Sequence, residues 1–223
     1  MGNRDLILSY ITIRRTIGIL GILLPVICLA GGYFLAHEPL KSSISLYYYT
    51  NMHDVFVGIL FMVAIFLVTY EDERKVDDFL TTIVGFAGFG IVIFPCKNIS
   101  EPISHIGTFQ LAAPTSDMIH LISASVFFIL LGFNSIFIFT RKKSGVKSDK
   151  RNEFIRNFIY IVSGVTILVC MSILIVCYFT QGECGFNNSN LPIIFESIML
   201  FAFGISWLIK GETFYKDREE KLQ

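Results

Sequence analysis

Apolar residues fall into six long runs that short polar segments separate. The runs cover residues 16–36, 52–70, 79–95, 118–140, 157–179 and 191–210. Each approaches the ~20 residues that a helix needs to cross a hydrocarbon core of about 30 Å, and none alternates like a barrel strand. The pattern predicts an all-α fold, a polytopic integral membrane helix bundle with about six transmembrane helices in a single transmembrane domain.

The second and third runs are short, and the segment between them indicates how they connect. Residues 71–78 carry charged side chains at every position but one, and so much charge is too costly to place in hydrocarbon. These two runs are therefore expected to be separate helices that form a hairpin. The first run has an alternative as a signal peptide, because Arg14 and Arg15 precede it, but its apolar stretch continues to spanning length.

Basic residues lie almost entirely on one side of a six-helix topology. All of the 18 Lys and Arg residues except Lys41 and Lys97 lie on the side of the N-terminus, and the densest group is the basic loop 141–156. Positive residues mark the cytoplasmic side of a membrane protein. The sequence thus predicts an N-in/C-in topology, with both termini in the cytoplasm and a plasma membrane or bacterial inner membrane as the location.

Composition narrows the classes of function. The chain is 53% hydrophobic and 16% charged, against roughly 25% charged for an ordinary soluble domain. Its formal net charge is zero, so no overall field points to a nucleic acid partner, and membrane lipids are the expected surroundings. The sequence has no P-loop, no GxGxxG after a strand and no GxSxG motif, which removes support for nucleotide-driven transport and for a standard serine hydrolase.

Histidines and carboxylates gather on the predicted outer side, where all four histidines fall. His53 and Asp54 open the second run. Asp117 and His120 lie three residues apart at the start of the fourth, which places them on one helical face. Glu196 lies inside the sixth run, where an ionisable residue costs about 2.5 kcal/mol or more without a partner or water. These residues predict an outward-facing site built from the second, fourth and sixth helices.

The sharpest form of this hypothesis is a metal site. His53 and His120 would bind a divalent metal such as zinc. Asp54, Asp117 or Glu196 would complete the ligand set or act in catalysis, and metal-bound water would be the nucleophile. A structural interpretation is the alternative, because Asp117 would complement the helix dipole in a first turn and His53 would lie at the membrane interface.

Residues 42–51 lead into the second run and contain three adjacent tyrosines. This composition is typical of an interfacial aromatic belt. The alternative is a short re-entrant or surface helix that covers a polar pocket. In that case Ser45 or Tyr48 would donate a hydrogen bond to the headgroup of a ligand.

The residues Ser45, His53, Asp54 and His120 are similar in kind to those of the membrane hydrolase superfamily that includes the alkaline ceramidases. The likeness covers isolated residues, the late HxxxH motif is absent and the number of spans differs, so no role is transferred from it. Three functions stay open. They are a metal-dependent hydrolase for a lipid or small polar substrate, a proton-linked transporter or channel that uses Glu196 and His120, and a non-catalytic membrane partner or sensor.

Cysteines and glycines add two smaller expectations. Cys96 and Cys184 both fall on the predicted outer face, so a disulfide between them is one alternative. Gly85, Gly88 and Gly90 in the third run allow close contact between helices and favour a compact bundle.

Overall fold

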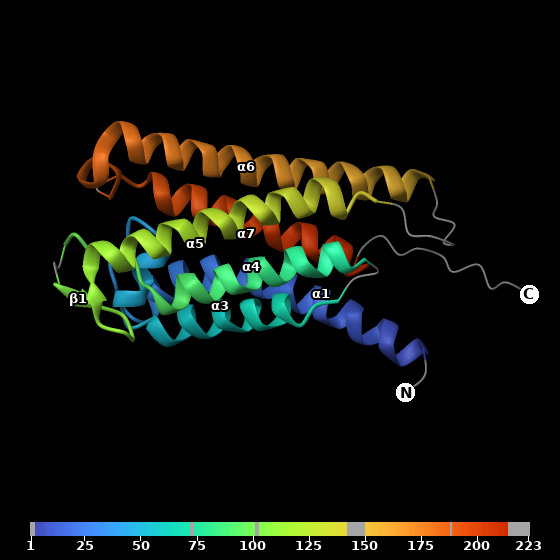
Figure 1. Cartoon of the computed structure of the whole chain (residues 1–223), viewed down its shortest axis with the longest axis horizontal. Helices are drawn as coiled ribbons and strands as arrows, with labels where there is room; N and C mark the ends of the chain where they lie inside the picture. Colours follow the sequence, from blue (N-terminus) through green and yellow to red (C-terminus); the bar gives the residue numbers. More distant parts are fainter. Residues whose placement is uncertain (1–2, 72–73, 101–102, 142–149, 188, 214–223) are drawn as a thin grey trace, which may run out of the picture.

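Helices make up nearly all of the structure, a computed structural model that describes residues 3–71, 74–100, 103–141, 150–187 and 189–213, with the backbone alone for residues 3–9 and 181–187. The elements are α1 (Asn3–Val26), the π-helical turn η1 (Ile27–Gly31), α2 (Gly32–Phe34), the 3-10 helix η2 (Ser45–Tyr49), α3 (His53–Val68), α4 (Lys75–Ile93), β1 (His105–Ile106), β2 (Leu111–Ala112), α5 (Ala113–Phe133), the π-helical turn η3 (Asn134–Ile138), α6 (Lys150–Asn187) and α7 (Leu191–Lys210). The long helices follow the long axis of the molecule, and the antiparallel β1–β2 hairpin lies at one end (Figure 1). The predicted all-α helix bundle is confirmed.

Most of the predicted transmembrane runs become long apolar helices. Five described stretches are long and apolar enough to cross a membrane, namely Tyr10–Phe34, Lys75–Ile93, Ala113–Ile138, Lys150–Thr180 and Leu191–Lys210. The remaining helix, α3, has 16 residues and measures about 24 Å, which is less than the thickness of a hydrocarbon core. The run 52–70 therefore gives a shorter helix than the other five.

Several helices extend beyond the predicted apolar runs. α1 begins at Asn3 rather than near residue 16, and α4 begins at Lys75 with two aspartates in its first turn. α6 covers Lys150–Asn187, whereas the apolar run covers 157–179. Hydropathy marks only the part of a helix that can lie in hydrocarbon, so it misses polar turns that continue the helix into water.

The two ends of the bundle differ in what they carry. The hairpin, η2 and the connections 35–52 and 94–112 lie at one end, which we name the hairpin end (Figure 1). α1 begins and α7 ends at the opposite end, which we name the terminal end. This arrangement agrees with an even number of helix passages, which the predicted N-in/C-in topology requires. Which end faces the cytoplasm stays a prediction.

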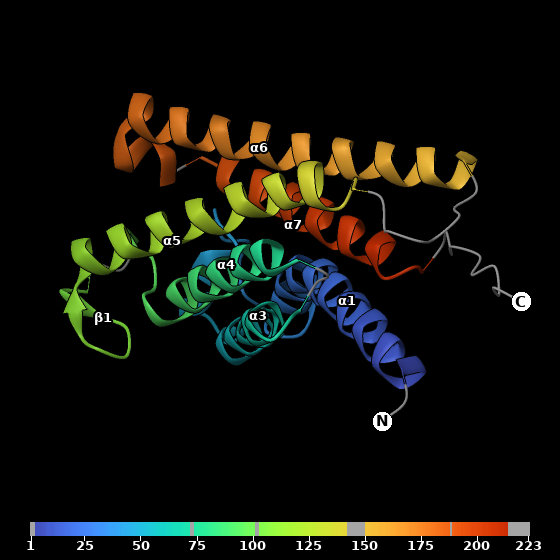
Figure 2. The ribbon, with the colours of Figure 1, turned by 45° about the vertical axis from the view of Figure 1, so that its right-hand side comes forward.

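The helices pack in a chain of neighbours in which α7 contacts α1 and α6, and α4 lies between α3 and α5 (Figure 2). Glycines make the α3–α4 contact close. A Cβ atom at Gly85 would lie 2.7 Å from the carbonyl oxygen of Ala64, and one at Gly88 would lie 3.0 Å from the Ala64 side chain. These positions of α4 need the smallest side chain, as predicted for a compact bundle.

Paired polar groups and aromatic rings close the terminal end. The buried Arg14 donates from Nε to the hydroxyl of Tyr70 at 2.7 Å, and the Tyr70 ring packs edge-to-face against Trp207. Arg141 pairs with Asp77 of α4 at 3.1 Å. One set of contacts joins α1 and α7 through Tyr70, and the other joins α4 to the residues after η3. The candidate functional residues all lie at the other end.

Candidate functional site

Residues 42–49 fold into the hairpin end of the bundle. The carbonyl of Ser42 accepts a hydrogen bond at 2.8 Å from the backbone N–H of Ile193, which joins the segment to α7. Tyr47 is fully buried, and the Tyr49 hydroxyl donates to the carbonyl of Cys96 at 2.6 Å. These two tyrosines pack within the protein. The segment therefore forms a short helix at the end of the bundle, as in the alternative to an aromatic belt, and its position relative to a membrane stays a prediction.

Glu196 of α7 holds this segment in place. Its carboxylate accepts hydrogen bonds from Ser43 Oγ at 2.8 and 2.9 Å and from the backbone N–H of Ile44 at 2.6 Å. Ser43 Oγ in turn accepts a hydrogen bond from the backbone N–H of Ser45 at 3.1 Å. A carboxylate within an apolar helix needs such donors, because burial of a charge without partners is very costly. Glu196 thus meets a serine and a backbone amide where a metal or a histidine was expected.

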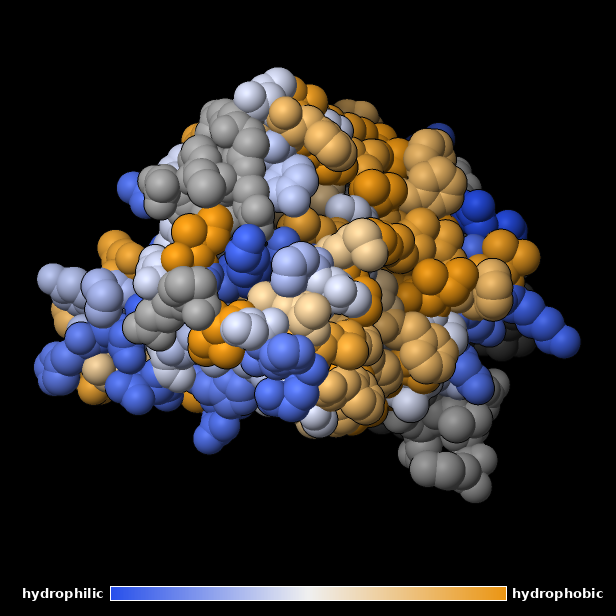
Figure 3. Space-filling view, turned by 60° about the vertical axis from the view of Figure 1, so that its left-hand side comes forward, coloured by the Kyte–Doolittle hydropathy of each residue, from blue (hydrophilic) through white to orange (hydrophobic). Residues whose placement is uncertain are grey.

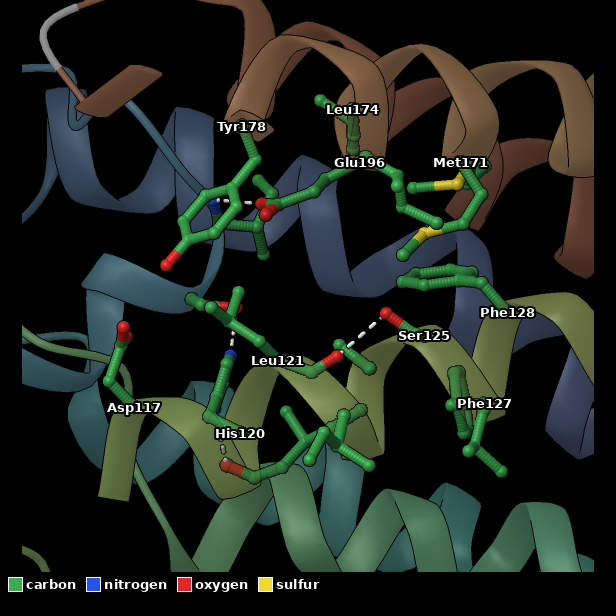
Figure 4. A pocket seen from close by; sticks show the side chains of 18 of the residues that line it. Asp117, His120, Leu121, Ser125, Phe127, Phe128, Met171, Leu174, Tyr178 and Glu196 are labelled. Atoms are coloured by element: carbon green, nitrogen blue, oxygen red, sulfur yellow. Dashed lines mark hydrogen bonds between the residues drawn. The ribbon is translucent and has the colours of Figure 1, made fainter. Parts of the chain in front are cut away.

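Ser45 begins η2, and its hydroxyl contacts His120 of α5. Ser45 Oγ lies 3.1 Å from His120 Nε2. His120, which is labelled in Figure 4, is 3% exposed. The other ring nitrogen, Nδ1, lies 2.9 Å from the carbonyl oxygen of Phe94 and 3.2 Å from that of Ile91. Because carbonyl oxygens only accept, Nδ1 carries the proton, and in the neutral imidazole Nε2 then accepts from Ser45. A hydroxyl held against an unprotonated imidazole nitrogen is the arrangement of an activated nucleophile.

The end of α4 supplies the carbonyl groups that face His120. α4 ends at Ile93, and the last carbonyls of a helix lack partners within the helix. The imidazole N–H satisfies two carbonyls at this end. A helix C-terminus also carries a partial negative charge, which favours a positively charged imidazole. The C-terminal end of α4 can therefore orient the imidazole, as the aspartate does in a Ser-His-Asp triad.

Hydrogen bonds hold the turn after α4 on the first turns of α5. Ser116 Oγ donates to the carbonyl of Pro95 at 2.9 Å, and Asp117 Oδ1 accepts from the backbone N–H of Lys97 at 2.8 Å. The turn also carries the Phe94 carbonyl that faces His120. Asp117 therefore helps to fix the position of the imidazole. The structural alternative expected for it was wrong in its detail, because α5 begins at Ala113 and has no acidic residue in its first turn.

A cavity of about 770 Å³ lies beside the Ser45–His120 pair. Its polar lining consists mainly of Ser45, Lys97, Asp117, His120 and Glu196. Apolar side chains form most of the remainder, including Phe127, Phe128, Met171, Leu174, Met199 and Leu200. Side chains of α5 face those of α6 and α7 across this space (Figure 4). The volume lies within the roughly 300–1,000 Å³ that is typical of small-molecule sites.

The structure brings four of the seven predicted site residues to this cavity, namely Ser45, Asp117, His120 and Glu196. The other three do not line it. His53 Nδ1 lies 2.6 Å from the carbonyl oxygen of Tyr48, and the two rings pack edge-to-face at 4.4 Å. Asp54 is exposed in the first turn of α3. The predicted site is therefore centred on α5, α7 and η2, and α3 contributes apolar walls.

The residues do not fit the predicted zinc site. Among the described residues, no group of three or more His, Cys, Asp and Glu side chains is placed to hold a metal ion. Both ring nitrogens of His120 already have partners, and His53 lies outside the cavity lining. The hypothesis that His53 and His120 share a metal has no support in the described part of the chain.

Two parts of the site were missed in the sequence. Ser43, which binds Glu196, precedes Ser45 by two residues, and the Ser-Ile-Ser pattern ahead of an apolar helix is a signal that could have drawn attention to it. The carbonyls of Ile91 and Phe94 leave no signal, because any residue type presents the same backbone group. Their role becomes visible only when the end of α4 is placed beside His120.

Cys96 lies near the site as a free thiol. Burial raises the pKa of the Cys96 thiol and of the Tyr49 hydroxyl well above their ordinary values, so both groups stay protonated at neutral pH. The structure does not describe the side chain of Cys184 or residues 142–149 of the basic loop. The predictions for these residues therefore lie outside the described part of the chain. The structure thus gives no nucleophilic thiolate at Cys96.

Comparison with known proteins gave no match to a family model, a curated protein or a solved structure. The likeness of isolated residues to the alkaline ceramidase superfamily gains nothing from these comparisons. The functional argument therefore depends on the geometry of the residues that line the cavity.

Proposed function

We propose that this protein is a membrane-embedded serine hydrolase that cleaves an ester or amide bond of a substrate with an apolar part. Ser45 is the nucleophile and His120 is the general base. The observation that carries the proposal is the contact of 3.1 Å between Ser45 Oγ and His120 Nε2 at the polar end of a largely apolar cavity. Nucleophile and base within hydrogen-bond reach, with the base oriented by a third group, are the signature of nucleophilic catalysis.

The reaction uses only groups that are already in contact. Ser45 Oγ attacks the carbonyl carbon of the substrate, and its proton passes to His120 Nε2. His120 then gives this proton to the leaving alcohol or amine as the bond to the carbonyl carbon breaks. Water attacks the acyl group on Ser45 and gives a proton to His120, which returns it to Ser45 Oγ as the acid leaves.

Burial disfavours the charged imidazole that forms during this step, and two features of the site offset part of this cost. The Nδ1–H of His120 keeps its hydrogen bonds to the carbonyls of Ile91 and Phe94 throughout. The C-terminal end of α4 adds a partial negative charge close to the ring. Because the ring is buried, little water screens this attraction. These contacts take the place of a carboxylate partner for His120.

Glu196 is a positioning residue in this scheme. Its two hydrogen-bond donors, Ser43 and Ile44, are the two residues before Ser45. Its hydrogen bonds place Ser45 against His120 in the way that a second layer of contacts orients a catalytic group. Asp117 is a positioning residue for His120, because it fixes the turn that follows α4.

A proton-linked transporter receives less support. A path from Glu196 toward the terminal end would need polar side chains that are available to a proton. Ser135 and Ser206, which lie in that direction, donate to the backbone carbonyls of Tyr160 and Phe203. The buried side chain of Asn134 has no hydrogen-bond partner among the described residues, but an amide does not take up or release a proton. A non-catalytic partner or sensor needs no activated hydroxyl at all. The hydrolase is the function that the Ser45–His120 contact favours.

The hairpin end is proposed to face the outside, with both termini in the cytoplasm of a cell that carries the protein in its plasma membrane or bacterial inner membrane. Support comes from the basic residues, all but two of which lie toward the terminal end in a six-helix topology. The substrate would then be reached from the outer side.

A small fluorophosphonate tests the proposal, because it reacts covalently with an activated serine hydroxyl. Purified protein in detergent should gain one adduct at Ser45, and Ser45→Ala should gain none there. His120→Ala should lower the labelling rate by about 10²–10⁴-fold, the usual contribution of a general base.

Ser125→Ala is the matched control. Ser125 lines the same cavity, but its hydroxyl donates to the carbonyl of Leu121 within α5, so its removal should leave the labelling rate unchanged. The proposal fails if folded wild-type protein gains no adduct at Ser45, or if His120→Ala is labelled as fast as the wild type.

A further inference from the structure

The cavity beside Ser45 opens through the side of the bundle, between the hairpin-end halves of α5 and α6. Three residues that line it are strongly exposed, namely Met118 (57%) and Ile122 (57%) of α5 and Phe179 (79%) of α6. All three are apolar. Because these side chains line the cavity and also reach the surface, we take them as the rim of its mouth, which is apolar.

The opening follows from how α5 and α6 cross. A Cβ atom at Gly164 would lie 2.7 Å from the carbonyl oxygen of Gly132, so the two backbones are in close contact there. Near the same point Ser135 Oγ donates to the carbonyl of Tyr160 at 2.9 Å. From this crossing the two helices move apart toward the hairpin end in both ribbon views (Figures 1 and 2). The gap widens over the residues that line the cavity.

The mouth lies on a part of the molecule that is suited to lipid. Ile122 belongs to α5 and Phe179 to α6, and both helices are long and apolar enough to cross a membrane. One side of the space-filling view is a broad hydrophobic surface, and hydrophilic residues gather on the other (Figure 3). In a bilayer, an apolar rim between two spanning helices meets acyl chains rather than water.

The cavity lining is graded in polarity along α5. Ser45, His120 and Glu196 lie at the polar end, whereas Phe128 is eight residues, or about 12 Å, farther along the helix than His120. Met171 of α6 lines the apolar part (Figure 4). A molecule that matches this lining has a polar group at the end near Ser45 and an apolar chain at the other, and the proposed chemistry adds a carbonyl to the polar group.

We infer that the substrate of the proposed hydrolase is a membrane lipid with an ester- or amide-linked acyl chain, which reaches Ser45 sideways through the opening between α5 and α6. The acyl chain lies against Phe128 and Met171, and its carbonyl lies at Ser45 and His120. Lys97 and Asp117 lie at the same polar end and surround the headgroup side. This inference rests on the proposed function, since it names the substrate class and the route to the same site.

Two fluorophosphonates of different length separate the route from the chemistry. One is small and soluble in water, and the other carries a hexadecyl chain and is supplied in phosphatidylcholine vesicles that contain the protein. Ile122→Trp fills the mouth with a bulky side chain and should lower the labelling rate of Ser45 by the hexadecyl probe at least about tenfold, equivalent to 1.4 kcal/mol in the barrier. Labelling by the small probe should stay within about twofold of the wild-type rate.

Val176→Trp is the matched control. Val176 is 58% exposed on α6 and is absent from the cavity lining, so tryptophan there adds the same bulk to a lipid-facing surface without blocking the mouth. Both probes should label this variant at the wild-type rate. Met118→Trp is a second mouth variant, and it gives the test an independent position should Ile122→Trp fail to insert.

The outcomes separate the two proposals. If neither probe labels Ser45 in the wild type, the proposed function fails and the lipid inference fails with it. If the small probe labels Ser45 but the hexadecyl probe does not, or if the mouth variants slow both probes equally, the hydrolase stands and lateral entry of a lipid is overturned.

Discussion

Replacing Glu196 by glutamine tests how the protein holds Ser45 in place. The Glu196 carboxylate accepts from Ser43 Oγ and from the backbone N–H of Ile44, the latter at 2.6 Å. Hydrogen bonds to a charged group are worth about 1.5–3 kcal/mol and neutral ones about 1 kcal/mol. Glutamine keeps the shape and loses the charge, so weakening two bonds should cost about 2 kcal/mol in the free energy of unfolding. Ser45 should also lose some of its alignment with His120.

Thermal unfolding in detergent, followed through fluorescence, measures the first effect. A loss of about 2 kcal/mol lowers Tm by roughly 4–8 °C in a chain of this size. Glu38→Gln is the control, because Glu38 pairs with Lys41 at 3.5 Å in a partly exposed contact that is worth about 0–1 kcal/mol. The rate of fluorophosphonate labelling at Ser45 measures the second effect, and it should fall in Glu196→Gln only.

Glu196→Leu extends the series. It removes both acceptors and leaves the Ser43 hydroxyl and the Ile44 N–H buried without them, at about 1–3 kcal/mol each. This variant should therefore be less stable than Glu196→Gln. The reasoning is refuted if Glu196→Gln unfolds at the same temperature as Glu38→Gln and Ser45 still reacts at the wild-type rate.

Four further predictions concern other parts of the molecule. Tyr70→Phe removes a buried acceptor from an arginine and should cost about 1.5–3 kcal/mol of stability while Ser45 labelling in the folded fraction stays constant; a slower labelling rate would contradict the separation of the two ends. Gly164→Leu overpacks the α5–α6 crossing and should cost about 1–3 kcal/mol by thermal unfolding; an unchanged Tm would count against the crossing. The Cys96 thiol, whose pKa burial raises, should react slowly with iodoacetamide even at about pH 9, whereas Thr108→Cys should react as an ordinary thiol; equal rates would argue against burial. Impermeant maleimide on whole cells should label Thr108→Cys but not Gly145→Cys, and the reverse would invert the topology.

The apolar runs predicted the helices well, because burial in lipid leaves a strong and continuous signal in the sequence. The largest difference concerns the run 52–70, whose helix α3 has only 16 residues. The residues before it, including Ser45 and Tyr47, turn back into the protein as η2. Aromatic residues look alike in a membrane interface and in a protein core, so composition could not distinguish these two places.

The candidate site was predicted in part. Residues at the start of a helix, such as Asp117 and His120, could be assigned to one face and one membrane depth from their spacing. Spacing within one helix says nothing about which neighbour faces it, so the sequence grouped His120 with His53 rather than with Ser45. The contact between His120 and the carbonyls at the end of α4 depends on tertiary packing and on backbone groups, and neither can be read from residue types.

The most direct test of the central claim is peptide mapping of wild-type protein after reaction with the small fluorophosphonate. A single stoichiometric adduct is expected on the peptide that contains Ser45, formed only while the protein is folded, because the contact with His120 exists only in the folded bundle. An adduct on another serine, no adduct on folded protein, or equal labelling of heat-unfolded protein would contradict the assignment of Ser45 as the nucleophile.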